Sequence, residues 1–128
     1  MNRLKHDAVR ARLEPLIQSG LVATCAVLEL EALYSAQSPD DYERLRAQRN
    51  AIFSYVETGD DDWQEALKIQ RTLASKSMHR VLKIPDSIIA VVAIRQRLTV
   101  LHYDSDFDHI AQCSTLSAEW VVPKGSVA

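Results

Sequence analysis

Residues 85–103, PDSIIAVVAIRQRLTVLHY, contain the feature that decides the fold. Pro85 and Asp86 open a helix, because proline suits the first helical position and an acid suits the positive end of the helix dipole. The apolar residues that follow continue this helix to about Gln96. Residues 98–103 are aliphatic and β-branched at their centre, which predicts a buried strand. A helix that leads directly into a buried strand is typical of an α/β protein.

The same alternation of helices and short strands extends through the rest of the chain. Short apolar runs predict strands at residues 21–25, 54–57 and 119–122. Helices are predicted at residues 7–14, 15–19, 27–36, from Ser38 onward, from Gly59 to about Ser75, and at 107–112. Pro15 is expected to separate the first two helices, and Gly20 to end the second. This order predicts a single α/β domain over residues 1–128, with a mostly parallel sheet flanked by helices.

Length and composition fit an ordinary globular domain and exclude several classes of protein. The chain has 128 residues, and 15 Lys and Arg against 17 Asp and Glu give a net charge of −2. A general coat of basic charge is therefore excluded, so any contact with nucleic acid must be local. The longest apolar run, residues 88–94, is far shorter than the roughly 20 residues of a membrane span. With no apolar leader and two distant cysteines, Cys25 and Cys113, we expect a cytoplasmic protein with reduced thiols.

Acidic residues gather where the predicted strands end or a helix begins. Glu29 and Glu31 follow the strand at 21–25, Asp86 opens the apolar helix, and Asp104 and Asp106 follow the strand at 98–103. A single acid of this kind is usually a helix cap. Several carboxylates at one sheet edge are costly unless a cation lies among them, and oxygen ligands alone favour Mg²⁺ or Mn²⁺. Such an ion most often handles phosphate, so hydrolysis of a phosphodiester is the chemistry that the pattern favours.

Three segments together resemble a known family. These are LELEALYSA at 28–36, KIPDSIIA at 83–90 and HYDSDFDHI at 102–110, with EWVV at 119–122 as the chain's last strand. The chain resembles a PIN domain, and more narrowly a VapC-type toxin of a type II toxin–antitoxin pair. The resemblance implies a three-layer α/β/α sandwich and a Mg²⁺- or Mn²⁺-dependent endoribonuclease. It also implies a homodimer and inhibition by a small VapB-type antitoxin.

The resemblance also implies a set of site residues. The metal-binding and catalytic acids of the family carry over onto Glu31, Asp86 and Asp104, with Asp106 as an outer metal ligand. Glu31 is preferred over Glu29 because the family's glutamate lies four positions before a small residue, here Ser35. In a helix Glu29 and Glu31 point about 200° apart, so both cannot face one metal ion.

Other side chains near these acids have two interpretations. Arg80 and Lys83 could hold an RNA backbone near Asp86, or they could belong to a solvated loop. Tyr34 could stack on a base, although packing in the core is favoured for it. Packing is also the interpretation favoured for Trp63, whose neighbours recur at helical spacing.

The family's first strand, which ends in Asp-x-Ser and supplies the first metal ligand, has no counterpart at the start of this sequence. Asp7 is the nearest acid, and no apolar run precedes it. Three explanations stay open: a start further upstream, a decaying remnant, or a strand supplied by another chain. The alternative to an enzyme is therefore a catalytically impaired PIN-domain remnant that acts only as an antitoxin- or protein-binding module.

Overall fold

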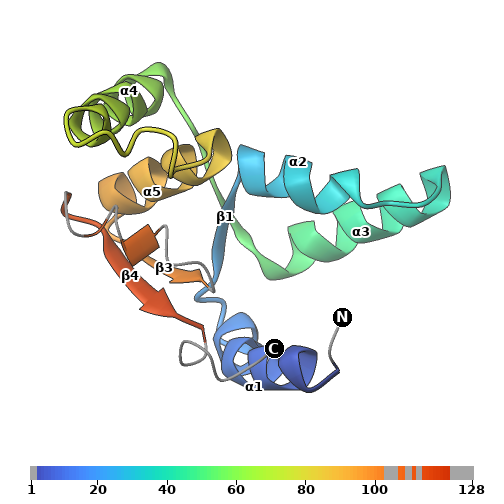
Figure 1. The fold of residues 1–128 in the computed structure, drawn as a ribbon. Coiled ribbons are helices and arrows are strands. Elements are labelled where there is room, and N and C mark those ends of the chain that lie inside the picture. Colours follow the sequence, from blue (N-terminus) through green and yellow to red (C-terminus); the bar gives the residue numbers. More distant parts are fainter. Residues whose placement is uncertain (1–2, 103–106, 109–110, 112–113, 122–128) are drawn as a thin grey trace. The chain divides into compact units, whose positions relative to one another are not determined.

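The computed structural model describes residues 3–102, 107–108, 111 and 114–121 (Figure 1). Its elements follow in the order α1 (Arg3–Gln18), β1 (Ala23–Cys25), α2 (Ala26–Tyr34), α3 (Pro39–Ile52), β2 (Ser54–Val56), α4 (Asp60–Ala74), α5 (Ile84–Gln96), β3 (Thr99–His102) and β4 (Ser117–Trp120). They form two compact units, one of which ends at Glu57, while the other begins at Thr58. The predicted α/β class is confirmed, since helices alternate with strands that pair in parallel.

Helix α1 ends in a glycine-dependent motif that the sequence predicted. Gly20 has a φ of +72°, its N–H donates to the carbonyl of Ile17, and the N–H of Leu21 donates to the carbonyl of Leu16. These two bonds satisfy carbonyls that the helix end would otherwise leave unpaired. They also hold Leu21 at the helix end, so strand β1 starts at Ala23 rather than at Leu21.

The expectation that Pro15 separates two helices is wrong, because α1 runs through it from Arg3 to Gln18. Proline removes one N–H from the helical ladder, and its ring crowds the preceding turn. It lies only three residues before the end of α1, however, and the next backbone bonds are intact: Ser19 donates to the carbonyl of Pro15. One lost bond near a helix end therefore does not stop this helix.

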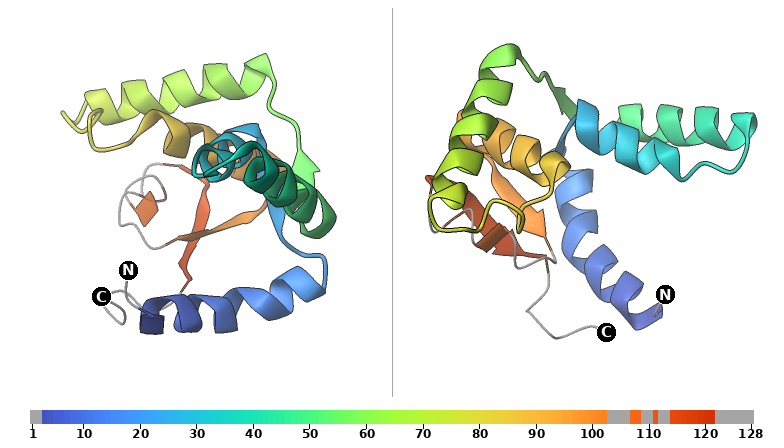
Figure 2. Two further views of the ribbon diagram at one scale, coloured as in Figure 1. Left: turned by 90° about the vertical axis from the view of Figure 1, so that its right-hand side faces the viewer. Right: turned by 45° about the horizontal axis from the view of Figure 1, so that its top comes forward.

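The first unit contains one parallel strand pair and a helical hairpin. Ala23, Thr24 and Cys25 of β1 pair with Ser54, Tyr55 and Val56 of β2. Helices α2 and α3 follow β1 and precede β2 in the chain. The two helices lie side by side (Figures 1 and 2). Helix α3 begins as the sequence predicts, because Ser38 Oγ accepts a hydrogen bond from the N–H of Asp41 at 3.0 Å and Pro39 is the first helical residue.

The second unit contains the other parallel pair, in which Thr99–His102 of β3 align with Ser117–Trp120 of β4. The last strand was predicted at residues 119–122 and begins two residues earlier, because its register is set by β3 rather than by its own apolar residues. Of the helix predicted at 107–112, Phe107, Asp108 and Ala111 are helical, and the remainder lies outside the described residues.

Helix α5 forms the centre of the core of the second unit, where it packs against α4 and β3 (Figure 2). Five of its apolar residues are buried: Ile88, Ala90, Val91, Val92 and Ala93. An ion pair between helices adds to this packing. Arg95 Nε lies 2.8 Å from Asp62 Oδ1, and the N–H of Gly59 donates to Asp62 Oδ2 at 3.0 Å. In the part of the chain that the structure covers, no helix is long and apolar enough to cross a bilayer.

Candidate functional site

The two glutamates of helix α2 have different surroundings, although only one residue separates them. Glu31 is exposed and makes no hydrogen bond or ion pair with any residue that the structure describes. Glu29 is mostly buried, with 18% of its side chain exposed, and forms an ion pair with Arg49 of α3. A rotation of 100° per residue separates the two side chains by about 200°, which accounts for the difference.

The contacts of Glu29 are numerous and come from two other elements. Arg49 Nη2 lies 2.8 Å from Oε2, and Arg49 Nε lies 3.0 Å from Oε1. The hydroxyl of the buried Thr24, on β1, also donates to Oε2. The hydrogen bonds from Arg49 lower the pKa of Glu29, with a smaller contribution from Thr24, against a desolvation that raises it. Glu29 is therefore an ionised structural acid whose oxygens are already engaged.

This difference bears directly on the choice between the two acids as metal ligands. A carboxylate bound in a fork to a guanidinium already has its charge paired and part of its lone pairs engaged, so Glu29 is poorly suited to hold a cation. Glu31 is exposed and its oxygens are accessible. Of the two acids, Glu31 is the one whose oxygens are accessible, and its role as a metal ligand stays a prediction.

Asp86, the second predicted ligand, is the third residue of α5 and is half-buried. It lies in the first turn, where the helix dipole favours a negative charge. Glu31 belongs to the first unit and Asp86 to the second. Asp104 and Asp106 lie outside the described residues.

The described residues alone do not make a metal centre. Among the side chains that the structure places, no three carboxylate, imidazole or thiolate groups gather as they would around an ion. The donor chemistry of the predicted set nevertheless suits Mg²⁺ or Mn²⁺, since all four members are carboxylates and Glu31 has accessible oxygens.

The predicted RNA contacts, Arg80 and Lys83, are both exposed in the segment that joins α4 to α5. Lys83 immediately precedes α5, and its carbonyl accepts a hydrogen bond from the N–H of Ser87. Both cations thus lie close in sequence to Asp86, in the same unit.

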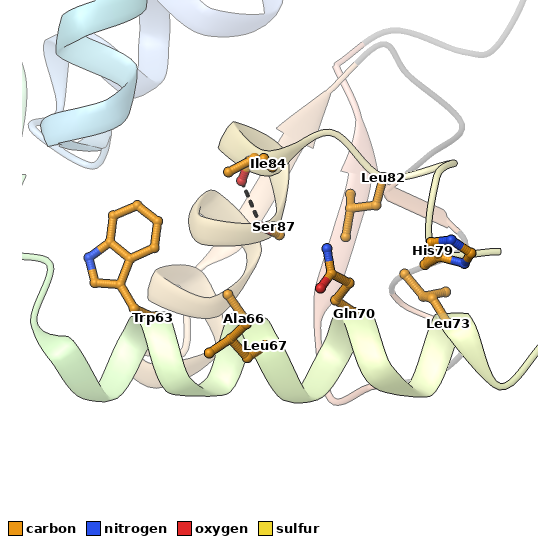
Figure 3. A pocket seen from close by; sticks show the side chains of 9 residues that line it. All are labelled: Trp63, Ala66, Leu67, Gln70, Leu73, His79, Leu82, Ile84 and Ser87. Atoms are coloured by element: carbon orange, nitrogen blue, oxygen red, sulfur yellow. Dashed lines mark hydrogen bonds between the residues drawn. The ribbon is translucent and has the colours of Figure 1, made fainter.

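A pocket that the sequence did not predict lies between α4, this segment and the start of α5 (Figure 3). Its lining is largely apolar: Trp63, Ala66, Leu67, Leu73, Leu82 and Ile84, together with Gln70, His79 and Ser87. Trp63 is 47% exposed, so its prediction as a core residue is wrong. Tyr34, also predicted to pack in the core, is 92% exposed. Helical spacing indicates a common face but does not say whether anything covers it.

Comparison with known proteins identifies the family of this chain. The PIN domain model matches residues 2–112, and the chain belongs to the PIN domain family. The three acidic segments predicted this family, and the match confirms the prediction.

Within this family the chain is of the VapC type. It is 45% identical to Ribonuclease VapC21 of Mycobacterium tuberculosis over 119 residues, which cover 93% of this chain and 86% of the relative. It is 40% identical to Ribonuclease VapC51 of the same organism over 127 residues, or 99% of this chain and 91% of that relative. Ribonuclease VapC18, also from M. tuberculosis, is 33% identical over 108 residues, covering 83% and 78% of the two chains.

Proposed function

We propose that this chain is a VapC-type endoribonuclease that hydrolyses RNA phosphodiester bonds with the help of Mg²⁺ or Mn²⁺. The observation that carries the proposal is the 45% identity, over 93% of the chain, to a relative named as a ribonuclease. The exposed carboxylate of Glu31, on a helix whose other glutamate is engaged by Arg49, supports it.

In this proposal four acids hold the divalent ion: Glu31, Asp86 and Asp104, with Asp106 as the outer member. When bound, the ion supplies a Lewis acid that activates water and neutralises charge on the phosphoryl group. The role of the protein is to fix these carboxylates. Asp86 has a fixed backbone, because it lies at the start of a helix whose later turns form the core of its unit.

Arg80 and Lys83 are proposed to bind the RNA backbone beside this site. Contacts from cations to phosphates position a nucleic acid without reading its sequence. The net charge of −2 makes such a local pair of cations more important than it would be on a basic protein.

The proposed protein partners are a cognate VapB-type antitoxin and a second copy of the chain, in the cytoplasm. Three large apolar side chains of the pocket are strongly exposed: Trp63, Leu67 and Ile84. An exposed apolar patch of this kind supports contact with another protein. An arginine from an antitoxin would also pair well with the acids of the site, because forked arginine–carboxylate contacts are strong.

The proposal is tested with a ribonuclease assay on a single-stranded RNA in Mg²⁺, in Mn²⁺ and in EDTA. Asp86→Asn should lower the rate by roughly 100-fold or more, because a lost ligand removes several kcal/mol of transition-state stabilisation. The matched control is Asp61→Asn, which also removes an acid from the first turn of a helix, here an exposed one. Equal rates for the two variants, or cleavage that survives EDTA, would refute the proposed metal-dependent site.

A further inference from the structure

The carboxylate of Glu29 ties three elements of the first unit together. Thr24 reaches it from strand β1 and Arg49 reaches it from helix α3, while Glu29 itself belongs to α2. The two side chains of the ion pair are largely shielded, with 18% of Glu29 and 23% of Arg49 exposed. Unlike a single exposed contact, a shielded and forked pair of this kind fixes both the distance between the two side chains and their relative orientation.

Arg49 also contacts an aromatic ring. Its guanidinium lies over the ring of Phe53, 4.7 Å from the centroid, where a cation–π contact is favourable. Phe53 directly follows α3 and directly precedes β2. The arginine is therefore held by both a carboxylate and an aromatic ring, which limits the freedom of α2 to rotate relative to α3.

The rotation of α2 decides where Glu31 points. No residue of α2 is fully buried, although Val27, Leu28 and Leu33 are half-buried, so the ion pair adds a directional contact to a helix that is only partly packed. Glu29 and Glu31 lie about 200° apart around the helix. When Glu29 is held toward α3 by Arg49, the carboxylate of Glu31 is turned away from that helix.

We propose that Glu29 and Arg49 are positioning residues for Glu31: their ion pair sets the rotation of α2 and so holds the proposed metal ligand in its working orientation. This inference depends on the proposed function, because it assigns to Glu31 a role in binding a divalent ion. Neither residue of the pair touches the ion in this account.

The test is the affinity of the full chain for Mn²⁺, measured as the loss of the free-ion signal in electron paramagnetic resonance. Arg49→Met should raise the dissociation constant about tenfold to 100-fold, the usual effect of losing a group that orients a metal ligand. A purely electrostatic effect has the opposite sign, since removing a cation near the site should tighten binding of another cation. Arg49→Lys should recover part of the affinity, because lysine keeps the charge but not the fork.

Two further variants separate positioning from folding. Glu29→Gln with Arg49→Met removes both charges and leaves no buried charge unpaired, so it should fold even if Arg49→Met alone destabilises the chain. We expect the double variant also to weaken Mn²⁺ binding. The matched control is Arg46→Met, on the same helix, whose pair with Glu43 is exposed. It should bind Mn²⁺ as the unchanged chain does.

The outcomes distinguish this inference from the proposed function. If Glu31→Gln weakens Mn²⁺ binding and the double variant does not, the metal site stands and the positioning role is overturned. If Glu31→Gln has no effect, or the unchanged chain does not bind Mn²⁺, the proposed site is wrong and the positioning role falls with it. Weaker binding in Glu31→Gln and in the single and double variants that carry Arg49→Met, with the Arg46 variant unchanged, supports the inference.

Discussion

The two units of this protein each join two helices by an arginine–carboxylate pair, but they differ in what surrounds the pair. In the second unit, Asp62 and Arg95 lie beside a helix with five buried apolar or small residues. In the first, Glu29 and Arg49 join α2 and α3, two fully described helices without a buried residue. The ion pair therefore accompanies fully buried apolar residues in one unit, whereas in the other it joins two helices whose apolar residues are at most half-buried.

The difference has a physical consequence for function. Apolar burial is strong but non-directional, whereas a forked ion pair is weaker and specifies orientation. Asp86 lies in the first turn of a helix with five buried residues, while Glu31 lies on a helix that combines half-buried apolar residues with a directional ion pair. The second unit should thus depend most on packing, and the first on charge, pH and local hydrogen bonds.

The largest expected effect is the loss of a core side chain. Ile88 is 1% exposed, and Ile88→Ala should lower the free energy of unfolding by about 2–5 kcal/mol, because it removes buried methyl groups and leaves a cavity. Ile84→Ala is the matched control on the same helix; Ile84 is 70% exposed, and its change should cost less than about 0.5 kcal/mol. Urea unfolding measures both. Similar losses would contradict the central role assigned to α5.

A smaller loss is expected from the ion pair of the second unit. Asp62 is 3% exposed, and Asp62→Asn should cost about 2 kcal/mol, since it weakens charged hydrogen bonds with Arg95. Glu65→Gln changes an exposed pair with Lys68 on the same helix and should cost less than about 0.5 kcal/mol. If Asp62→Asn were as mild as this control in urea unfolding, the core alone would hold α4 to α5.

The pH dependence should reveal the ion pair of the first unit. Arg49 holds the pKa of Glu29 below its ordinary value, so the stabilisation is complete above the unfolded-state pKa of about 4.3 and disappears as the pH falls through the lower folded value. Glu29→Gln should therefore flatten the fall in thermal midpoint between about pH 6 and about pH 3. Part of the fall in thermal midpoint should remain in the Glu29→Gln variant, because the pKa of Asp62 is also below its ordinary value. Burial raises the pKa of Asp62, but Arg95 and the N–H of Gly59 together lower it more.

The control for this titration is Glu43→Gln, whose pair with Arg46 is exposed. It should follow the unchanged protein across the whole range. A Glu29→Gln curve that is parallel to that of the unchanged protein would show that the pair does not stabilise the first unit.

The smallest expected effect is on a helix cap of the first unit. Ser38→Ala removes the hydrogen bond from the N–H of Asp41 and should cost about 1 kcal/mol. Because α3 has no buried residue, amide hydrogen exchange in its first turns should accelerate, while exchange in α5 stays unchanged. Equal acceleration in both helices would show that the two units open together.

Local features were predictable from the sequence because their causes are local. The cap at Ser38 and the left-handed residue at Gly20 each depend on hydrogen bonds within a few residues. The opposite directions of Glu29 and Glu31 follow from 100° per residue. The α/β class followed from the alternation of elements, and PIN family membership from three short acidic segments, which the comparison confirms.

Tertiary structure decided what depends on residues distant in the chain. The partner of Glu29 is Arg49, 20 positions away, and that of Asp62 is Arg95, 33 positions away; no local pattern selects either. Strand β4 takes its register from β3, so the prediction from its own apolar residues placed its start two positions too late. The exposure of Trp63 likewise depends on what covers its helix. Spacing along a chain fixes the direction of a side chain within its own element, whereas its contacts are fixed only when another element meets it.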